Sequence, residues 1–222
     1  ILSEADHLRI SSAVEAAERR SDGEIATMIA RQSDYYRDWM LGLAALAAFL
    51  AIALVAFEPS AFRELVRLVV GDWSSGINTG RIIAAILALA VIKFIAVYLV
   101  LLWVPLRMWL TPPSLKRARV RREAIRAFRI GIESRTRART GVLIYLSLAE
   151  HRAEIVADAA INEKVGVEEW GEAMTELVAL LKQDRPADAI VSAVEYAGAL
   201  IAQHFPRSAD DTNEMPDRVI EL

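Results

Sequence analysis

Residues 39–57 read WMLGLAALAAFLAIALVAF, a run of nineteen residues without a charged side chain. A helix of this length spans about 28 Å at about 1.5 Å per residue, which is close to the hydrocarbon thickness of a bilayer. A buried core helix is the alternative interpretation, but it would need a far larger domain around it. The segment therefore predicts a first transmembrane helix.

A second apolar run, residues 82–110, is interrupted only by Lys93, Pro105 and Arg107. The two runs predict a transmembrane hairpin, because aromatic residues typical of a membrane interface flank its entry and its exit. These membrane-interface residues are Tyr35, Tyr36, Trp39, Trp103 and Trp109. Residues 58–81 are expected to form an extracytoplasmic loop with a short interfacial helix that begins near Pro59.

Lys93 is the one charge within the central part of the second run. A charge at the centre of a membrane helix costs at least about 2.5 kcal/mol, so it needs a physical reason. Lys93 either reaches the outer interface along its aliphatic stem, or it pairs with an acid in a homo-oligomer or in a partner protein. Residues 39–57 contain no acid that could pair with it.

Charge is distributed unevenly around the hairpin. Basic residues exceed acidic ones by eight in residues 111–140, whereas acids exceed bases by ten in residues 141–222. The basic residues that follow the second run are Lys116, Arg117, Arg119, Arg121, Arg122, Arg126 and Arg129, with Glu123 as the one nearby acid. The basic residues of the connecting loop are only Arg63, Arg67 and Arg81. The positive-inside rule therefore predicts that both termini are cytoplasmic.

The basic stretch is expected to be a helix that lies near anionic lipid headgroups. Its predicted apolar stripe contains Leu115, Ala118, Arg122, Ile125, Phe128 and Ile132. Nucleic acid is not expected as a partner, because Phe128 is the one aromatic residue available and it belongs to this stripe. Residues 1–4 show neither a basic region nor a cleavage site, so no cleavable signal peptide is expected.

The segments 1–38 and 111–205 carry the pattern of an α/β domain that the hairpin interrupts. Ser3 and Asp6 have the spacing of a helix-capping box. Apolar stripes predict three helices: one with Ile10, Ala13, Val14 and Ala17, one with Trp170, Ala173, Met174, Leu177 and Leu181, and one with Ile190, Ala193, Val194, Ala197 and Ile201. Residues 24–30 and 141–148 predict buried strands, and residues 153–158 an edge strand. We expect a mixed sheet of about three strands.

Three stretches carry a family resemblance: SDGEI at 21–25, RTRARTGVLIYLSLAEHRAEIVAD at 135–158 and HFPRSADDTNEMPDRVIEL at 204–222. They resemble the TPM domain family, in its bacterial membrane-protein branch with an inserted hairpin. The resemblance implies a three-layer α/β sandwich in a multi-pass protein of the bacterial cytoplasmic (inner) membrane. Members of that family include an acid phosphatase of the thylakoid lumen, photosystem-repair factors and a receptor-associated auxiliary protein. Related sequences often have glycine and histidine at the positions of Ala159 and Asn162, so a phosphatase or metal site does not transfer directly.

The expected topology gathers Glu24, Arg139 and Asp158 at the edge of the domain farthest from the membrane. This cluster is either a solvated ionic patch or a site for a polar ligand or a calcium ion, with Glu24 and Asp158 as the candidate ligands. No other cofactor and no dedicated metal site are expected. The chain lacks cysteine, which excludes thiolate chemistry and Cys-based zinc sites, and His7, His151 and His204 are far apart in the sequence.

No catalytic residue follows from these patterns. We expect a non-enzymatic scaffold or an assembly and maintenance factor that presents a cytoplasmic domain to an unidentified protein partner. The alternative is a membrane-bound, phosphatase-like hydrolase, which rests on family analogy alone. Residues 206–222 are expected to form an acidic extended tail, whose last residues either add to a sheet edge, of this domain or of a partner, or remain disordered.

Overall fold

A computed structural model describes residues 2–70, 79–131, 140–208 and 218–222. The chain divides into two compact units. One combines residues 1–34 with residues 112–222, and the other contains residues 35–111.

The first unit is built on a mixed sheet of four strands, β1 (Glu24–Ala30), β2 (Gly141–Ser147), β3 (Arg152–Ala157) and β4 (Ile220–Glu221). Their order is β3-β2-β1-β4. β2 and β4 run parallel to β1, whereas β3 is antiparallel to β2. The predicted α/β class is confirmed, and the expected number of about three strands is approximate because the two-residue β4 adds a fourth.

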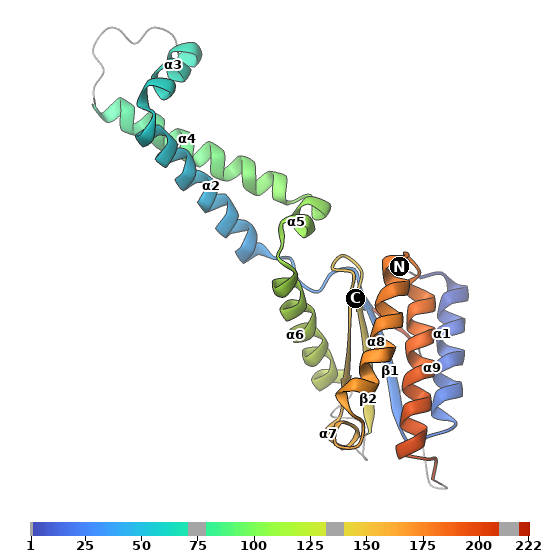
Figure 1. The fold of residues 1–222 in the computed structure, drawn as a ribbon. Coiled ribbons are helices and arrows are strands. Elements are labelled where there is room, and N and C mark those ends of the chain that lie inside the picture. Colours follow the sequence, from blue (N-terminus) through green and yellow to red (C-terminus); the bar gives the residue numbers. More distant parts are fainter. Residues whose placement is uncertain (1, 71–78, 132–139, 209–217) are drawn as a thin grey trace. The chain divides into compact units, whose positions relative to one another are not determined.

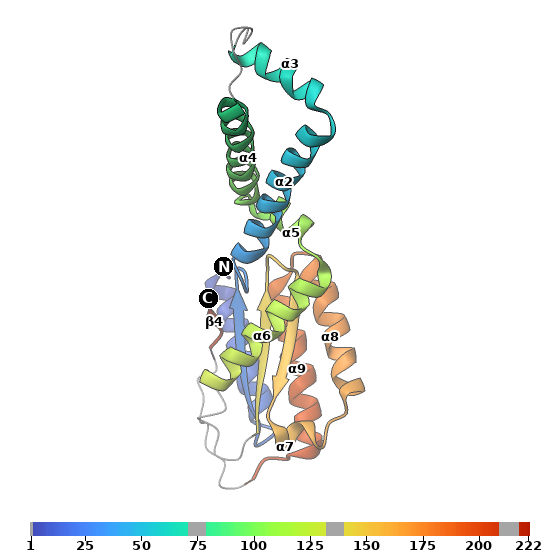
Figure 2. The same cartoon turned by 90° about the vertical axis from the view of Figure 1, so that its left-hand side faces the viewer.

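Helices cover both faces of this sheet and make three layers (Figures 1 and 2). Helices α1 (Glu4–Glu18), α8 (Val167–Lys182) and α9 (Pro186–His204) share one core with the sheet, and α6 (Pro113–Gly131) forms a second core on the opposite face. β1 and β2 are buried along their whole lengths, which explains why their sequences are mostly apolar, with Glu24, Thr27 and Ser147 as the polar exceptions. The short helix α7 (Ala159–Asn162) follows β3.

The predicted helices of the larger core are present, and their stripes face inward. Both hydrogen bonds of the capping box between Ser3 and Asp6 are formed at the start of α1. The buried stripes contain Ile10, Val14 and Ala17 of α1, Leu177 and Leu181 of α8, and Ile190, Ala193, Val194, Ala197 and Ile201 of α9. Trp170 and Met174 pack against this core. The side chain of Ala173 is not among those that the structure describes.

The stripe predicted for the basic helix is confirmed for Phe128 and wrong for Ala118 and Arg122. α6 buries Val120, Ala124 and Phe128 against the sheet, whereas Ala118 and Arg122 are exposed. Leu115 and Ile125 are half-buried, so the buried face is displaced from the predicted one towards Val120 and Ala124. Ile132 lies outside the described residues.

The end of the chain belongs to the sheet, which corrects the domain boundary predicted at residue 205. β4 pairs with β1, and Val219 is 5% exposed and part of the larger core. The backbone N–H of Leu222 donates to Ile29 O at 2.9 Å, and Arg31 N–H donates to Leu222 O at 3.2 Å. Of the alternatives for the tail, addition to the sheet of its own domain is the one observed.

The second unit contains α2 (Arg37–Phe57), α3 (Pro59–Val70), α4 (Thr79–Leu101) and α5 (Val104–Leu110). α2 and α4 pack against each other, and both are long and apolar enough to cross a membrane. The second apolar run was predicted as one continuous helix, and this is wrong. The helix is interrupted at Leu102 and Trp103. Pro105 explains the break, since proline fits the first turn of α5 but lacks the N–H that a continuous helix would bond to the carbonyl of Leu101.

Candidate functional site

The structure brings the candidate ligands Glu24 and Asp158 to one end of the sheet. Gly141 of β2 lies between them. It pairs with Glu24 of β1 on one side, and on the other side the pairing of Val142 with Ala157 places Gly141 next to Asp158. Glu24 is 7% exposed and Asp158 is 5% exposed. Arg139, the third member of the predicted cluster, lies outside the described residues.

Asp158 has a structural role at this end of the sheet. Its carboxylate accepts a hydrogen bond from Gly141 N–H at 3.0 Å, and its own N–H donates to Gly141 O at 2.9 Å. Asp158 also precedes the first residue of α7. Among the described residues, no group of three or more His, Asp or Glu side chains could hold a metal ion. Calcium at this edge therefore stays a prediction that rests on two carboxylates.

A buried polar network lies at the opposite end of β1 and β2, where the sequence had not indicated one. Ser33 Oγ lies 3.0 Å from Tyr145 Oη and donates to Ser147 Oγ at 2.9 Å. Glu150 accepts from Ser147 Oγ at 2.5 Å and from Ser33 N–H at 3.1 Å. Burial raises the pKa of the Tyr145 phenol to about 12, although the hydrogen bond with Ser33 opposes that shift.

This network holds the segment that follows β1 against the domain. Leu148 N–H donates to Ala30 O at 3.0 Å, and Ala149 N–H donates to Arg31 O at 2.9 Å. Asp34, the last residue of this unit before the hairpin, forms a 2.8 Å ion pair with Arg119 of α6. The chain therefore leaves the sheet along a segment fixed by both backbone and side-chain contacts.

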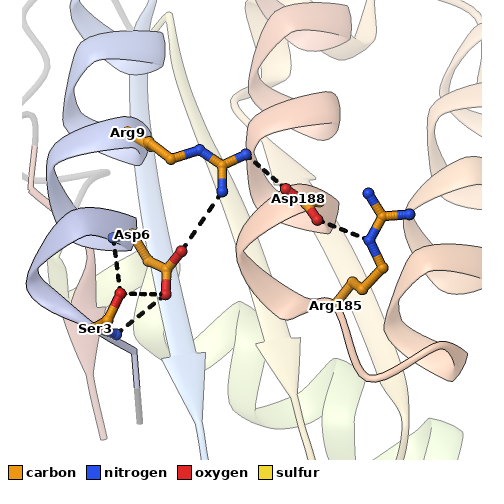
Figure 3. A network of polar contacts seen from close by, with 5 residues as sticks. All are labelled: Ser3, Asp6, Arg9, Arg185 and Asp188. Atoms are coloured by element: carbon orange, nitrogen blue, oxygen red, sulfur yellow. Dashed lines mark hydrogen bonds and ion pairs between the residues drawn. The ribbon is translucent and has the colours of Figure 1, made fainter.

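A second polar network joins the beginnings of α1 and α9 on the surface (Figure 3). Arg9 donates to Asp188 at 2.6 Å, and Arg185 donates to the other oxygen of Asp188 at 2.8 Å. The Asp6 carboxylate accepts hydrogen bonds from Ser3 N–H and Ser3 Oγ and lies 3.6 Å from the Arg9 guanidinium. The hydrogen bonds from Arg9 and Arg185 lower the pKa of Asp188. Such an exposed network supports the packing of the two helices and resembles no catalytic arrangement.

The predicted membrane-interface residues differ in exposure. Tyr35, Trp103 and Trp109 are exposed, by 64%, 66% and 80%. Trp39 is half-buried. Tyr36 is fully buried and has the left-handed backbone angle φ of 53° before α2. Lys93 is exposed on α4, so its side chain is available for either of the two arrangements expected for it.

A groove that no sequence pattern predicted runs beside the edge strand β3. It has a volume of about 580 Å³ and is bordered by α6, β3 and α8. Its apolar part includes Ala153, Met174 and Val178, and its cationic residues are Arg117, Arg152 and Lys182. His151 also borders it. Burial raises the pKa of Glu154, the one carboxylate in the lining, while nearby Arg121 opposes the shift.

The geometry defines a class of protein, an α/β sandwich interrupted by two helices long and apolar enough to cross a membrane. The fold is similar to the NMR structure of the BA42 protein from the psychrophilic bacterium Bizionia argentinensis, with a TM-score of 0.57. That likeness covers 100% of this chain and 96% of the other at 17% sequence identity, so it concerns the fold alone. No family model and no curated protein sequence matches the chain.

Proposed function

We propose that the chain is a membrane-anchored, TPM-like domain protein of the bacterial cytoplasmic membrane. Its α/β domain acts as a non-enzymatic scaffold or assembly factor that presents a binding surface to protein partners in the cytoplasm. Both termini are cytoplasmic in this proposal. The observation that carries it is the exposed apolar surface of α2 and α4.

These two helices pack on each other through small and medium-sized side chains and leave larger ones uncovered. Met40, Ala44 and Ala90 are buried. The exposed ones on α2 include Phe49 and Leu54, at 69% and 68%, and those on α4 include Leu87 and Ile92, both at 63%. Two neighbouring helices that expose so many large apolar residues would aggregate in water, whereas lipid tails solvate them.

The outward face of α6 supports the orientation. Arg122, Arg126 and Arg129 border a shallow surface with Ile125 and Ile130, and Ile130 is 68% exposed. Arginine beside exposed isoleucine suits the boundary between anionic headgroups and acyl chains. We assign this surface to anionic lipid on the cytoplasmic side.

Membrane extraction tests the anchor. Full-length protein in isolated membranes should remain in the pellet after carbonate at high pH and should be released by detergent. A peripheral protein would be released by carbonate alone, and that result would overturn the proposal. Replacing both Phe49 and Leu54 by Lys should prevent stable insertion, because each charge at this depth is unfavourable by about 2.5–3.5 kcal/mol.

Cysteine labelling tests the orientation, and the natural chain has no cysteine to interfere. Ser75→Cys should react with a membrane-impermeant maleimide in intact spheroplasts. Ser208→Cys should react only after permeabilisation. The reverse pattern would place the domain outside the cytoplasm.

The scaffold role is tested by crosslinking in native membranes followed by affinity purification. We expect reproducible protein partners that depend on the folded domain. A phosphate-ester hydrolase is the competing function, and the purified full-length protein should be assayed with p-nitrophenyl phosphate. The hydrolase would be favoured if the wild-type protein hydrolysed this substrate and if Asp158→Ala abolished the activity without changing the fold.

A further inference from the structure

The outer edge of β3 is an open sheet edge. In the described part of the chain β3 pairs with β2 on one side, and no strand pairs with it on the other. The C-terminal strand β4 joins β1 at the far end of the sheet and so leaves this edge uncovered. Open edges carry backbone donors and acceptors that can pair with an added strand.

Two hydrogen bonds identify which backbone groups point outward. Asp158 N–H donates to Gly141 O, so the backbone groups of Asp158 face β2. Asn162 Nδ2 donates to Ala157 O at 2.7 Å from the other side, so those of Ala157 face outward. Because the direction alternates along a strand, the N–H and C=O groups of Ala153 and Ile155 also face outward. These groups form a short row next to the groove.

The side chains around the groove divide by face. Ala153 and Ile155 belong to the core that α8 covers, where Met174 and Val178 also pack. Val156 belongs to the core that α6 covers. On the side of α6 the groove is bordered by Arg117, and Arg121 lies 3.9 Å from Glu154. A strand added here would alternate between apolar surroundings and cationic ones.

The side chain of Arg152 also indicates that this groove binds an anionic ligand. Its Nε is buried and has no hydrogen-bond partner among the described residues. A buried donor without an acceptor is unfavourable by about 1–3 kcal/mol, and an added carboxylate would supply the acceptor. Arg117, Arg152 and Lys182 give the lining three cations against the single carboxylate of Glu154.

We propose that the groove beside β3 binds an extended polypeptide segment by strand addition, and that this segment alternates acidic with apolar residues. The backbone of the segment pairs with Ala153 and Ile155. Its acidic side chains meet Arg117 and Arg152, and its apolar side chains contact Met174 and Val178. The inference rests on the proposed scaffold function, since it names the chemistry of the partner that the scaffold would bind.

Fluorescence anisotropy with a labelled hexapeptide, EVDVEI, tests the proposal on full-length protein in phosphatidylcholine nanodiscs. The acidic peptide should bind, and a lysine analogue, KVKVKI, should not. A version of EVDVEI that is N-methylated at alternate residues keeps its charges but loses the strand hydrogen bonds, so it should bind at least about tenfold more weakly. Equal binding of the parent and N-methylated peptides would overturn strand addition.

Protein variants locate the binding. Arg152→Gln and Arg117→Gln should each weaken binding by about tenfold, because each removes a charged hydrogen-bond donor. Arg20→Gln is the matched control, since Arg20 is exposed and borders neither this groove nor the surface assigned to lipid. An equal loss in all three variants would mean diffuse attraction and would overturn the proposal.

Ile155→Pro removes an outward N–H and leaves the hydrogen bonds to β2 in place. It should abolish peptide binding, and the N-methylated peptide gives the same test without altering the protein. Phosphatidylglycerol vesicles that displace the peptide, through Arg117 and Arg152, would identify a membrane surface as the occupant and overturn the peptide. If the protein resists carbonate extraction but does not bind the peptide, the proposal of peptide binding is refuted. The proposal of membrane anchoring is then unaffected.

Discussion

The carboxylate of Asp158 and the backbone N–H of Gly141 are joined by a hydrogen bond of 3.0 Å in a buried environment. Asp158→Ala should lower the free energy of unfolding by about 1–3 kcal/mol, because it leaves a buried donor without its acceptor. Asp158→Asn retains an acceptor oxygen, so it should lower the free energy of unfolding by less. Urea denaturation in detergent micelles, followed by tryptophan fluorescence, measures both. Equal losses in the two variants would contradict this role.

Tyr145 should stay protonated in the folded protein at a pH where its phenol would ionise in the unfolded chain. Burial raises its pKa to about 12. The unfolded chain releases this proton near pH 10, so the folded state binds more protons between pH 10 and 12 and loses stability as the pH rises. Absorbance titration should show a phenol that ionises near pH 12, and this component should be absent from Tyr145→Phe. Thermal unfolding of Tyr145→Phe should depend less on alkaline pH.

Gly198 permits close contact between α9 and α1. A Cβ at this position would overlap the Cβ of Ala17 and lie 3.2 Å from its Cα. Gly198→Ala should therefore destabilise the domain by about 1–3 kcal/mol through overpacking. Gly171 of α8 has nothing within 4 Å of such an atom, so Gly171→Ala should stabilise it by about 0.4–1 kcal/mol. Chemical denaturation of the two variants should give opposite signs.

The network around Asp188 should contribute stability at neutral pH and lose it in acid. Hydrogen bonds from Arg9 and Arg185 lower the pKa of Asp188 below its ordinary value of 3.8. The contribution is therefore present above that ordinary value and disappears as the pH falls through the lowered one. Asp188→Asn should reduce Tm at pH 7, by less in high salt. Glu176→Gln, which changes the charge equally at an exposed site, should leave Tm unchanged.

Glu154→Gln should strengthen binding of the acidic hexapeptide in the groove beside β3. The raised pKa of Glu154 means that its charged form is disfavoured where it lies, chiefly by burial. Its removal takes away the one carboxylate that repels an acidic segment, and we expect about a tenfold gain in affinity. The same anisotropy titration measures it, and the lysine analogue should gain nothing.

The sequence indicated those parts of the fold whose patterns have one interpretation. The apolar runs of β1 and β2 and the capping box of α1 are examples, and the expected topology also brought Glu24 and Asp158 to one edge. The buried face of α6 was misjudged in part, because the predicted stripe included Phe128 but left out Val120 and Ala124, which are buried with it. The break before α5 depended on Pro105, and β4 is too short to give a periodic pattern.

The groove beside β3 could not be predicted for a different reason. An alternating strand indicates an edge position, yet it does not say whether another segment covers that edge. The answer depends on which end of the sheet the C-terminal residues join. The orphaned donor of Arg152 likewise depends on neighbours that come from three separate elements.

The interleaving of sheet and hairpin determines the order of events during biosynthesis. β1 leaves the ribosome before α2 and α4, whereas β2, β3 and β4 follow them. Under the proposed membrane anchoring, the first strand therefore waits, without its neighbours, until the apolar helices have been handed to the insertion machinery. Under the same proposal the domain completes its folding after targeting. A chain stalled before residue 220 would lack β4 and would leave one edge of β1 without a partner strand.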